Sequence, residues 1–111
     1  MLTEAELLER IKALVSVGKY IVRNHVMQHM FAEGFTIKDL VEAVKGKCRI
    51  VEDYPNALRC LVGGSFQLGE NARVPLHIVF EYSNAEEVDI VTAYIPQKPW
   101  WTTPWQRGRS K

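Results

Sequence analysis

The sequence predicts an α+β fold in which helices come first and an antiparallel sheet follows. Three observations lead to this prediction. Apolar residues recur at helical spacing up to residue 46, the period changes to two from residue 47, and the candidate strands are joined by short turns. Short links between consecutive strands favour antiparallel pairing, and helices that precede the strands are expected to pack on one face of the sheet.

The first predicted helix spans residues 3–17. Thr3 and Glu6 fit a capping box, in which each side chain bonds the other residue's backbone. Apolar side chains then recur on one face, and Gly18 is placed to end the helix. The alternating residues 19–23 are typical of a short strand.

Two more helices are expected before the main sheet. Residues 25–33 have the pattern of a helix that Asn24 caps and Gly34 ends. Thr36 opens the third helix, with Asp39 at the capping-box position.

Four further strands are predicted from the alternation in the second half of the chain. They span about residues 47–53, 57–64, 75–82 and 87–94, with turns at 54–56, 69–73 and 83–86. In the third strand Leu76 and Ile78 share the apolar face, so His77 is expected on the other face, toward solvent.

Length and composition bound the class of protein. The 111 residues (12.7 kDa) are expected to form a single domain over 1–111, with a leading helix (1–18), an α+β core (19–95) and a tail (96–111). A hydrophobic fraction of 47% excludes a chain that is disordered throughout. No apolar run approaches the roughly 18 residues that a membrane span needs. The acidic start, Met-Leu-Thr-Glu-Ala-Glu, predicts no export, so we expect a cytoplasmic protein with reduced cysteines.

Charge is distributed unevenly along the chain. Residues 1–96 hold 10 basic and 13 acidic residues (net −3), whereas residues 97–111 hold 4 basic and no acidic residues (net +4). A general nucleic-acid binder usually has a stronger positive excess, so any RNA contact is expected to be local, and the tail is one obvious place for it. Pro96, Pro99 and Pro104 are expected to break regular structure there.

A series of local motifs runs through the chain in order. They are His25-Val26 with His29-Met30 and Gly34, Glu52-Asp53-Tyr54-Pro55, Pro75-Leu76-His77, and Thr92-Ala93-Tyr94-Ile95-Pro96 followed by Trp100. Together they resemble the family catalogued as domain of unknown function 4258, over about residues 5–105. Two positions depart from the family pattern: His29 stands where the family has Arg, and Asn71-Ala72-Arg73 replaces Asp-Gly-Arg.

The resemblance implies a distant relationship to RelE/ParE/BrnT-type toxins. It therefore implies a RelE-like fold, a toxin of a toxin–antitoxin pair, an antitoxin as protein partner, and RNA or the ribosome as target. The activity that the resemblance implies is RNA cleavage without a metal or another cofactor, or else RNA binding.

Such cleavage needs a base, an acid and a cation beside the scissile phosphate. The candidates are His77 as acid or base, Tyr94 as its partner, Arg59 as the cation and His25 as a second proton carrier. For such cleavage we expect His77, Tyr94 and an arginine to converge in one open cleft. Candidates for RNA binding combine basic and aromatic side chains: Arg49, Lys98, Trp100, Arg107 and Arg109.

Two other hypotheses stay open. The tail, with Trp100, Trp101 and Trp105, has the composition of a protein-interaction anchor, so the chain is alternatively a non-catalytic interaction module or a homo-oligomer that pairs through the tail. His25 and His29 are four residues apart, which suits two zinc ligands, but the sequence indicates no third ligand and we assign no metal site. The alternative for His77 is a hydrogen-bonded structural residue.

Overall fold

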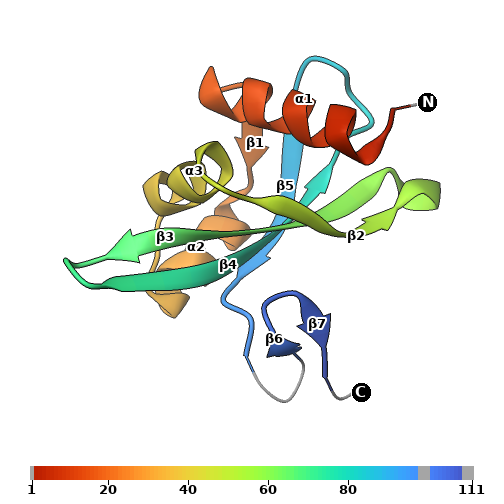
Figure 1. The fold of residues 1–111 in the computed structure, drawn as a ribbon. Helices are drawn as coiled ribbons and strands as arrows, with labels where there is room; N and C mark the ends of the chain where they lie inside the picture. Colours follow the sequence, from red (N-terminus) through yellow and green to blue (C-terminus); the bar gives the residue numbers. More distant parts are fainter. Residues whose placement is uncertain (1, 98–100, 109–111) are drawn as a thin grey trace.

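The computed structural model describes residues 2–97 and 101–108, and it has the α+β architecture that the sequence predicts (Figure 1). None of the helices in this part of the chain is long and apolar enough to cross a membrane. A short 3-10 helix, labelled η1, joins the second and third strands of the chain. The elements are α1 (Glu4–Ser16), β1 (Tyr20–Val22), α2 (Asn24–Glu33), α3 (Ile37–Lys45), β2 (Arg49–Tyr54), η1 (Pro55–Ala57), β3 (Arg59–Leu68), β4 (Ala72–Glu81), β5 (Val88–Tyr94), β6 (Trp101–Thr103) and β7 (Gln106–Arg107).

The main sheet has the strand order β1-β5-β4-β3-β2. Strands β2 to β5 form an antiparallel run, as predicted. The short strand β1 joins the outer edge of β5 in parallel, with Ile21 opposite Asp89. This parallel pairing makes the sheet mixed. It joins strands more than 60 residues apart in sequence, so no local turn signal announces it.

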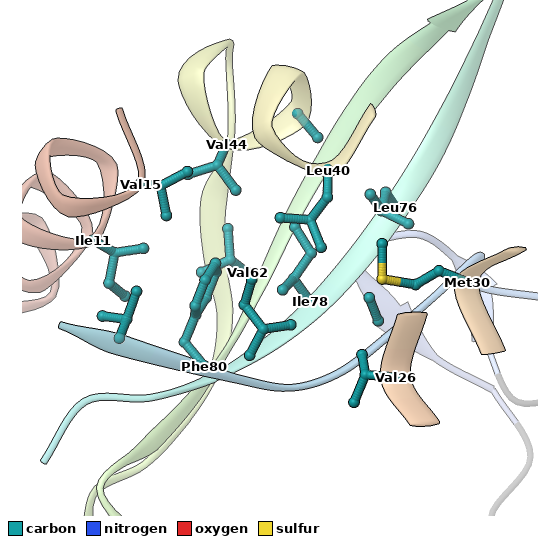
Figure 2. Packing of buried hydrophobic residues seen from close by; sticks show 14 of the residues in the cluster. Ile11, Val15, Val26, Met30, Leu40, Val44, Val62, Leu76, Ile78 and Phe80 are labelled. Carbon is teal, nitrogen blue, oxygen red and sulfur yellow. The ribbon is translucent and has the colours of Figure 1, made fainter. Parts of the chain in front are cut away.

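One hydrophobic core lies between the sheet and the helices. Leu76, Ile78 and Phe80 of β4 are fully buried against it. Figure 2 shows that all three helices contribute to this cluster, so they cover the same face of the sheet. Their labelled core residues are Ile11 and Val15 of α1, Val26 and Met30 of α2, and Leu40 and Val44 of α3.

Most of the predicted helix caps are present in the structure. Both Thr3 bonds of the capping box are present in α1, and the backbone N–H of Thr36 donates to Asp39 at 2.9 Å at the start of α3. Gly34 ends α2 in the left-handed conformation, with φ of 95°. The predicted cap of α2 is wrong. Arg23 occupies the N-cap position without a side-chain bond, and Asn24 is the first helical residue.

The C-terminal tail contains two short strands that the sequence did not predict, and Pro96 and Pro104 lie outside the strands, as expected. Strands β6 and β7 make a small hairpin, and Pro104 lies in the turn between them, where its missing N–H is not needed. Trp101 and Pro104 of the hairpin contact His77, which alternates with the core residues Leu76 and Ile78, so the hairpin lies on the sheet face opposite the core. Lys98, Trp100 and Arg109, which the sequence nominates for RNA binding, lie outside the described residues.

Both cysteines are free thiols, as expected for reduced residues. Cys60 is buried in the core, and this burial raises its pKa to about 12. Cys48 is half-buried at the start of the sheet, and burial likewise raises its pKa. A thiol with a raised pKa is a poor nucleophile, so neither cysteine is suited to covalent catalysis.

Candidate active site

The sheet face that the helices leave free carries two rows of residues, most of them polar or charged. Because side chains alternate along each strand, residues paired across neighbouring strands point to the same side. One row runs through Arg49, Gly63, His77 and Tyr94. The other runs through Tyr54, Arg59, Glu81, Asp89 and Ile21, and so crosses all five strands.

The β6–β7 hairpin covers the first row. The side chain of His77 has no exposed surface, and its ring meets that of Trp101 edge-on with 4.4 Å between centroids. Nε2 of His77 lies 2.5 Å from the carbonyl oxygen of Pro104, and Nδ1 lies 3.2 Å from the hydroxyl of Tyr94. The expectation that His77 faces solvent is therefore wrong. Alternation placed the residue on the correct face, but the tail folds over it.

These partners determine the protonation of the ring. The carbonyl of Pro104 can only accept a hydrogen bond, so Nε2 of His77 carries the hydrogen and Nδ1 accepts from the hydroxyl of Tyr94. Burial lowers the pKa of His77, because the imidazolium ion would lose its hydration; the bond to Pro104 opposes this shift. Burial also raises the pKa of Tyr94. A neutral, sealed imidazole with both nitrogens occupied is not placed to exchange protons with a substrate.

An ion pair fastens the hairpin to the sheet edge. Nε and Nη2 of Arg107 each donate to the carboxylate of Glu52 at 3.0 Å, and this bidentate bond is the main reason that the pKa of Glu52 is lowered. The guanidinium also lies 4.4 Å from the ring centroid of Trp101. Arg107, which the sequence nominates for RNA binding, therefore holds the tail in place. The hydroxyl of Tyr54 donates to the same carboxylate.

Trp105 packs where β3 has no side chain. A Cβ atom on Gly63 would lie 2.5 Å from the indole, so only glycine admits the ring at this point. The guanidinium carbon of Arg49 lies 4.1 Å from the Trp105 ring centroid. Arg49, which the sequence nominates for RNA binding, is exposed.

Three residues of the second row, Arg59, Glu81 and Asp89, line a polar crevice of about 190 Å³. Two of the four predicted catalytic residues, His25 and Arg59, meet here, and both are exposed. The other two, His77 and Tyr94, lie under the hairpin, so the expectation of one common cleft is wrong. The crevice is lined by Arg23, His25, Arg59, Glu81, Asp89 and Val91.

Charges of both signs are fixed within the crevice. Nη2 of Arg23 donates to Oδ2 of Asp89 at 3.1 Å, while Oδ1 of Asp89 is buried and has no hydrogen-bond partner among the described residues. The hydroxyl and the backbone N–H of Ser83 both donate to Oε1 of Glu81, and these bonds lower the pKa of Glu81. The crevice thus combines two guanidinium groups, an imidazole and two carboxylates, the groups that acid–base chemistry at a phosphate requires.

Four residues of this crevice were not among the predicted site residues: Arg23, Glu81, Asp89 and Val91. Part of the signal was present, because Glu81 alternates with Phe80 as His77 does with Ile78, which puts Glu81 on the polar face. The strand register that aligns Glu81 with Arg59 and Asp89 was not readable from the sequence.

The two helical histidines do not form a pair. His29 forms an ion pair with Glu33, one turn further along α2, whereas His25 lines the crevice. Within residues 2–97 and 101–108, no group of three or more histidine, cysteine or acidic residues is arranged to hold a metal ion.

Comparison with known proteins adds one finding. The family model described as Domain of unknown function (DUF4258) matches residues 22–95. This range contains every residue that lines the crevice, whereas the β6–β7 hairpin lies outside it. No curated protein and no solved structure matches the chain.

Proposed function

The chain belongs to the family described as Domain of unknown function (DUF4258), and we propose that it is a toxin-like protein that cleaves RNA without a metal ion. The proposed active site is the crevice of His25, Arg59, Glu81 and Arg23. One observation carries the proposal: strand pairing and the start of α2 bring an imidazole, two guanidinium groups and a carboxylate to one accessible hollow.

The reaction assigned to this site is attack of the ribose 2′-hydroxyl on the adjacent phosphate. Glu81 takes the hydroxyl proton as the oxygen bonds to phosphorus, and His25 donates a proton to the departing 5′-oxygen as its bond to phosphorus breaks. The products are a 2′,3′-cyclic phosphate and a 5′-hydroxyl end. Proton exchange with water then restores both side chains. Oε1 of Glu81 is engaged by Ser83, so Oε2 is the oxygen proposed to act as base.

The two arginines stabilise the charge that accumulates on the phosphate. Arg59 is the first residue of β3, which pairs with a strand on each side, and its guanidinium can bind two phosphate oxygens at once. Arg23 is oriented by Asp89, at a distance of 3.1 Å. His25 lies in the first turn of α2, where the free backbone N–H groups also favour a bound anion.

The interaction-module hypothesis receives less support. Trp101 is 4% exposed and packs on its own chain, so it is not free to anchor a partner. In the proposed function, a protein partner is an antitoxin that inhibits cleavage by covering the crevice of Arg23 and Arg59.

The proposal is tested with purified protein and a fluorescent single-stranded RNA in the presence of EDTA. We expect cleavage to leave 2′,3′-cyclic phosphate ends, and Glu81→Gln or His25→Gln to lower the rate by about 100-fold or more. Lys38→Ala is the matched control, because Lys38 is exposed on α3 and belongs to neither row nor crevice. A substrate with a 2′-deoxy residue at the cut site should resist cleavage. No cleavage by the wild type, or equal rates in the wild type and Glu81→Gln, would overturn the proposal.

A further inference from the structure

A second and larger cavity lies between the sheet and the β6–β7 hairpin. Its volume is about 690 Å³, within the range of about 300–1,000 Å³ typical of small-molecule sites. Lys47, Arg49 and Arg73 contribute positive charge, and none of the described residues that line the cavity is acidic. Pro75, Pro104 and Trp105 contribute apolar surface. We propose that this cavity binds a nucleotide, with the phosphate on the cations and the base on the apolar wall.

Two of the three cations, Arg73 and Arg49, are held in position before any ligand arrives. Arg73 donates to the hydroxyl and the carbonyl oxygen of Ser65, at 3.1 and 3.0 Å, and to the side-chain oxygen of Gln67 at 3.1 Å. Its guanidinium also pairs with the carboxylate of Glu42 at 3.8 Å, which offsets part of its charge. Arg49 is oriented by the Trp105 ring. Within residues 2–97 and 101–108, neither Lys47 nor Arg49 forms a side-chain hydrogen bond or ion pair, so their N–H groups are available to a phosphate. A preorganised guanidinium loses little entropy on binding an anion.

The apolar part of the cavity has the chemistry of a base-binding wall. Trp105 is 42% exposed although one part of its ring packs on Gly63, and the two proline rings add flat hydrocarbon surface. Stacking of a base on an aromatic side chain contributes about 1–3 kcal/mol and tolerates every base. A phosphate alone would use only half of this lining, which is why the cavity fits a nucleotide better than a simple anion.

This site is separate from the crevice. Ser65 at the cavity and Arg59 at the crevice are six residues apart on β3, about 20 Å along an extended strand. The inference therefore does not rest on the proposed cleavage activity. The nucleotide is either free or one unit of an RNA strand, since both present the same phosphate and base.

Calorimetric titration distinguishes these sources. The Glu81→Gln protein, in which the proposed cleavage is blocked, is titrated with AMP, UMP, inorganic phosphate and a short single-stranded RNA. We expect the monophosphates to bind more tightly than inorganic phosphate. Lys47→Ala and Arg49→Ala should each weaken nucleotide binding by about 10-fold. Lys38→Ala again serves as the matched control.

Each outcome bears on the inference. An RNA strand is supported as the ligand if RNA binds at least 10-fold more tightly than AMP and if its affinity depends on Lys47 and Arg49. Equal affinities for RNA and AMP support a free nucleotide. Unchanged affinity in both alanine variants overturns the site, as does the absence of binding by any of the four probes. Equal affinity for AMP and inorganic phosphate overturns the nucleotide assignment. Arg49→Ala could also displace Trp105, because the Arg49 guanidinium stacks on that ring. In that case the affinity of Lys47→Ala for the nucleotide decides whether the cations of the cavity bind the phosphate.

Discussion

The imidazole of His77 donates a hydrogen bond from Nε2 to the backbone carbonyl of Pro104, at 2.5 Å and 27 residues further along the chain. This bond joins the centre of the sheet to the turn of the C-terminal hairpin. The bond occupies a ring nitrogen that a catalytic histidine would need. His77 also has no exposed surface. The relationship makes His77 a structural residue that fixes the tail.

His77→Ala is therefore expected to lower stability and to leave the chemistry of the crevice intact. Loss of two buried hydrogen bonds and of ring packing should cost about 2–3 kcal/mol in the free energy of unfolding. Tyr94→Phe, which removes one of those bonds, should cost about 1 kcal/mol. Urea denaturation measures both changes. A 100-fold loss of RNA cleavage in His77→Ala with unchanged stability would return His77 to the active site.

Acidification should destabilise the protein through the same contact. Burial lowers the pKa of His77 below its ordinary value of 6.5, so below that pH the unfolded chain binds a proton that the folded chain resists. The contribution of His77 is thus present above its unfolded pKa and is lost as pH falls toward its folded pKa. Glu52 acts in the same direction at lower pH, because Arg107 lowers its pKa below 4.5.

The measurement is the free energy of unfolding between about pH 7.5 and pH 3.5. His77→Gln should flatten the upper part of this profile, from about pH 7 to pH 5, and Glu52→Gln should flatten the lower part. A wild-type stability that rises on acidification from pH 7 to pH 5 would contradict the expected sign.

The sequence was sufficient for features set by local periodicity. The capping boxes at Thr3 and Thr36 and the burial of alternate residues such as Ile78 depend on neighbours within four positions, so the pattern contains the information. The same alternation placed His77 on the polar face.

What covers that face was not predictable in the same way. The burial of His77 depends on Trp101 and Pro104, and the crevice depends on a strand register that sets Arg59 beside Glu81. Both are long-range pairings. The tail strands are also three and two residues long and flank a proline, so they give almost no periodic signal.

The adjacent glycines of β3 should respond differently to the same substitution. In Gly63→Ala the new Cβ would lie 2.5 Å from the Trp105 ring and 2.8 Å from a methyl group of Val51. Both obstacles are side chains, and the indole can move away. We expect tryptophan fluorescence to shift to longer wavelength and stability to fall by about 1–3 kcal/mol.

In Gly64→Ala the new Cβ would lie 2.7 Å from the backbone carbonyl of Ala43, which is fixed within α3. That contact cannot be relieved by a side-chain rotation, so the loss of stability should exceed that of Gly63→Ala, without the shift in fluorescence. Equal losses in the two variants would mean that Trp105 is held as firmly as the helix backbone.

The ion pair between Glu52 and Arg107 should contribute a modest, salt-sensitive stabilisation. Its geometry is bidentate, but the Arg107 side chain is 56% exposed, so solvent screens the attraction. A double-mutant cycle with Glu52→Gln and Arg107→Gln should give a coupling free energy of about 0.5–1 kcal/mol, reduced in about 1 M salt. The Arg23–Asp89 pair, at the other end of the sheet, is the control cycle, and its coupling should not change when Arg107 is replaced. Strict additivity of Glu52→Gln and Arg107→Gln would show that packing of Trp101, rather than the ion pair, fastens the hairpin.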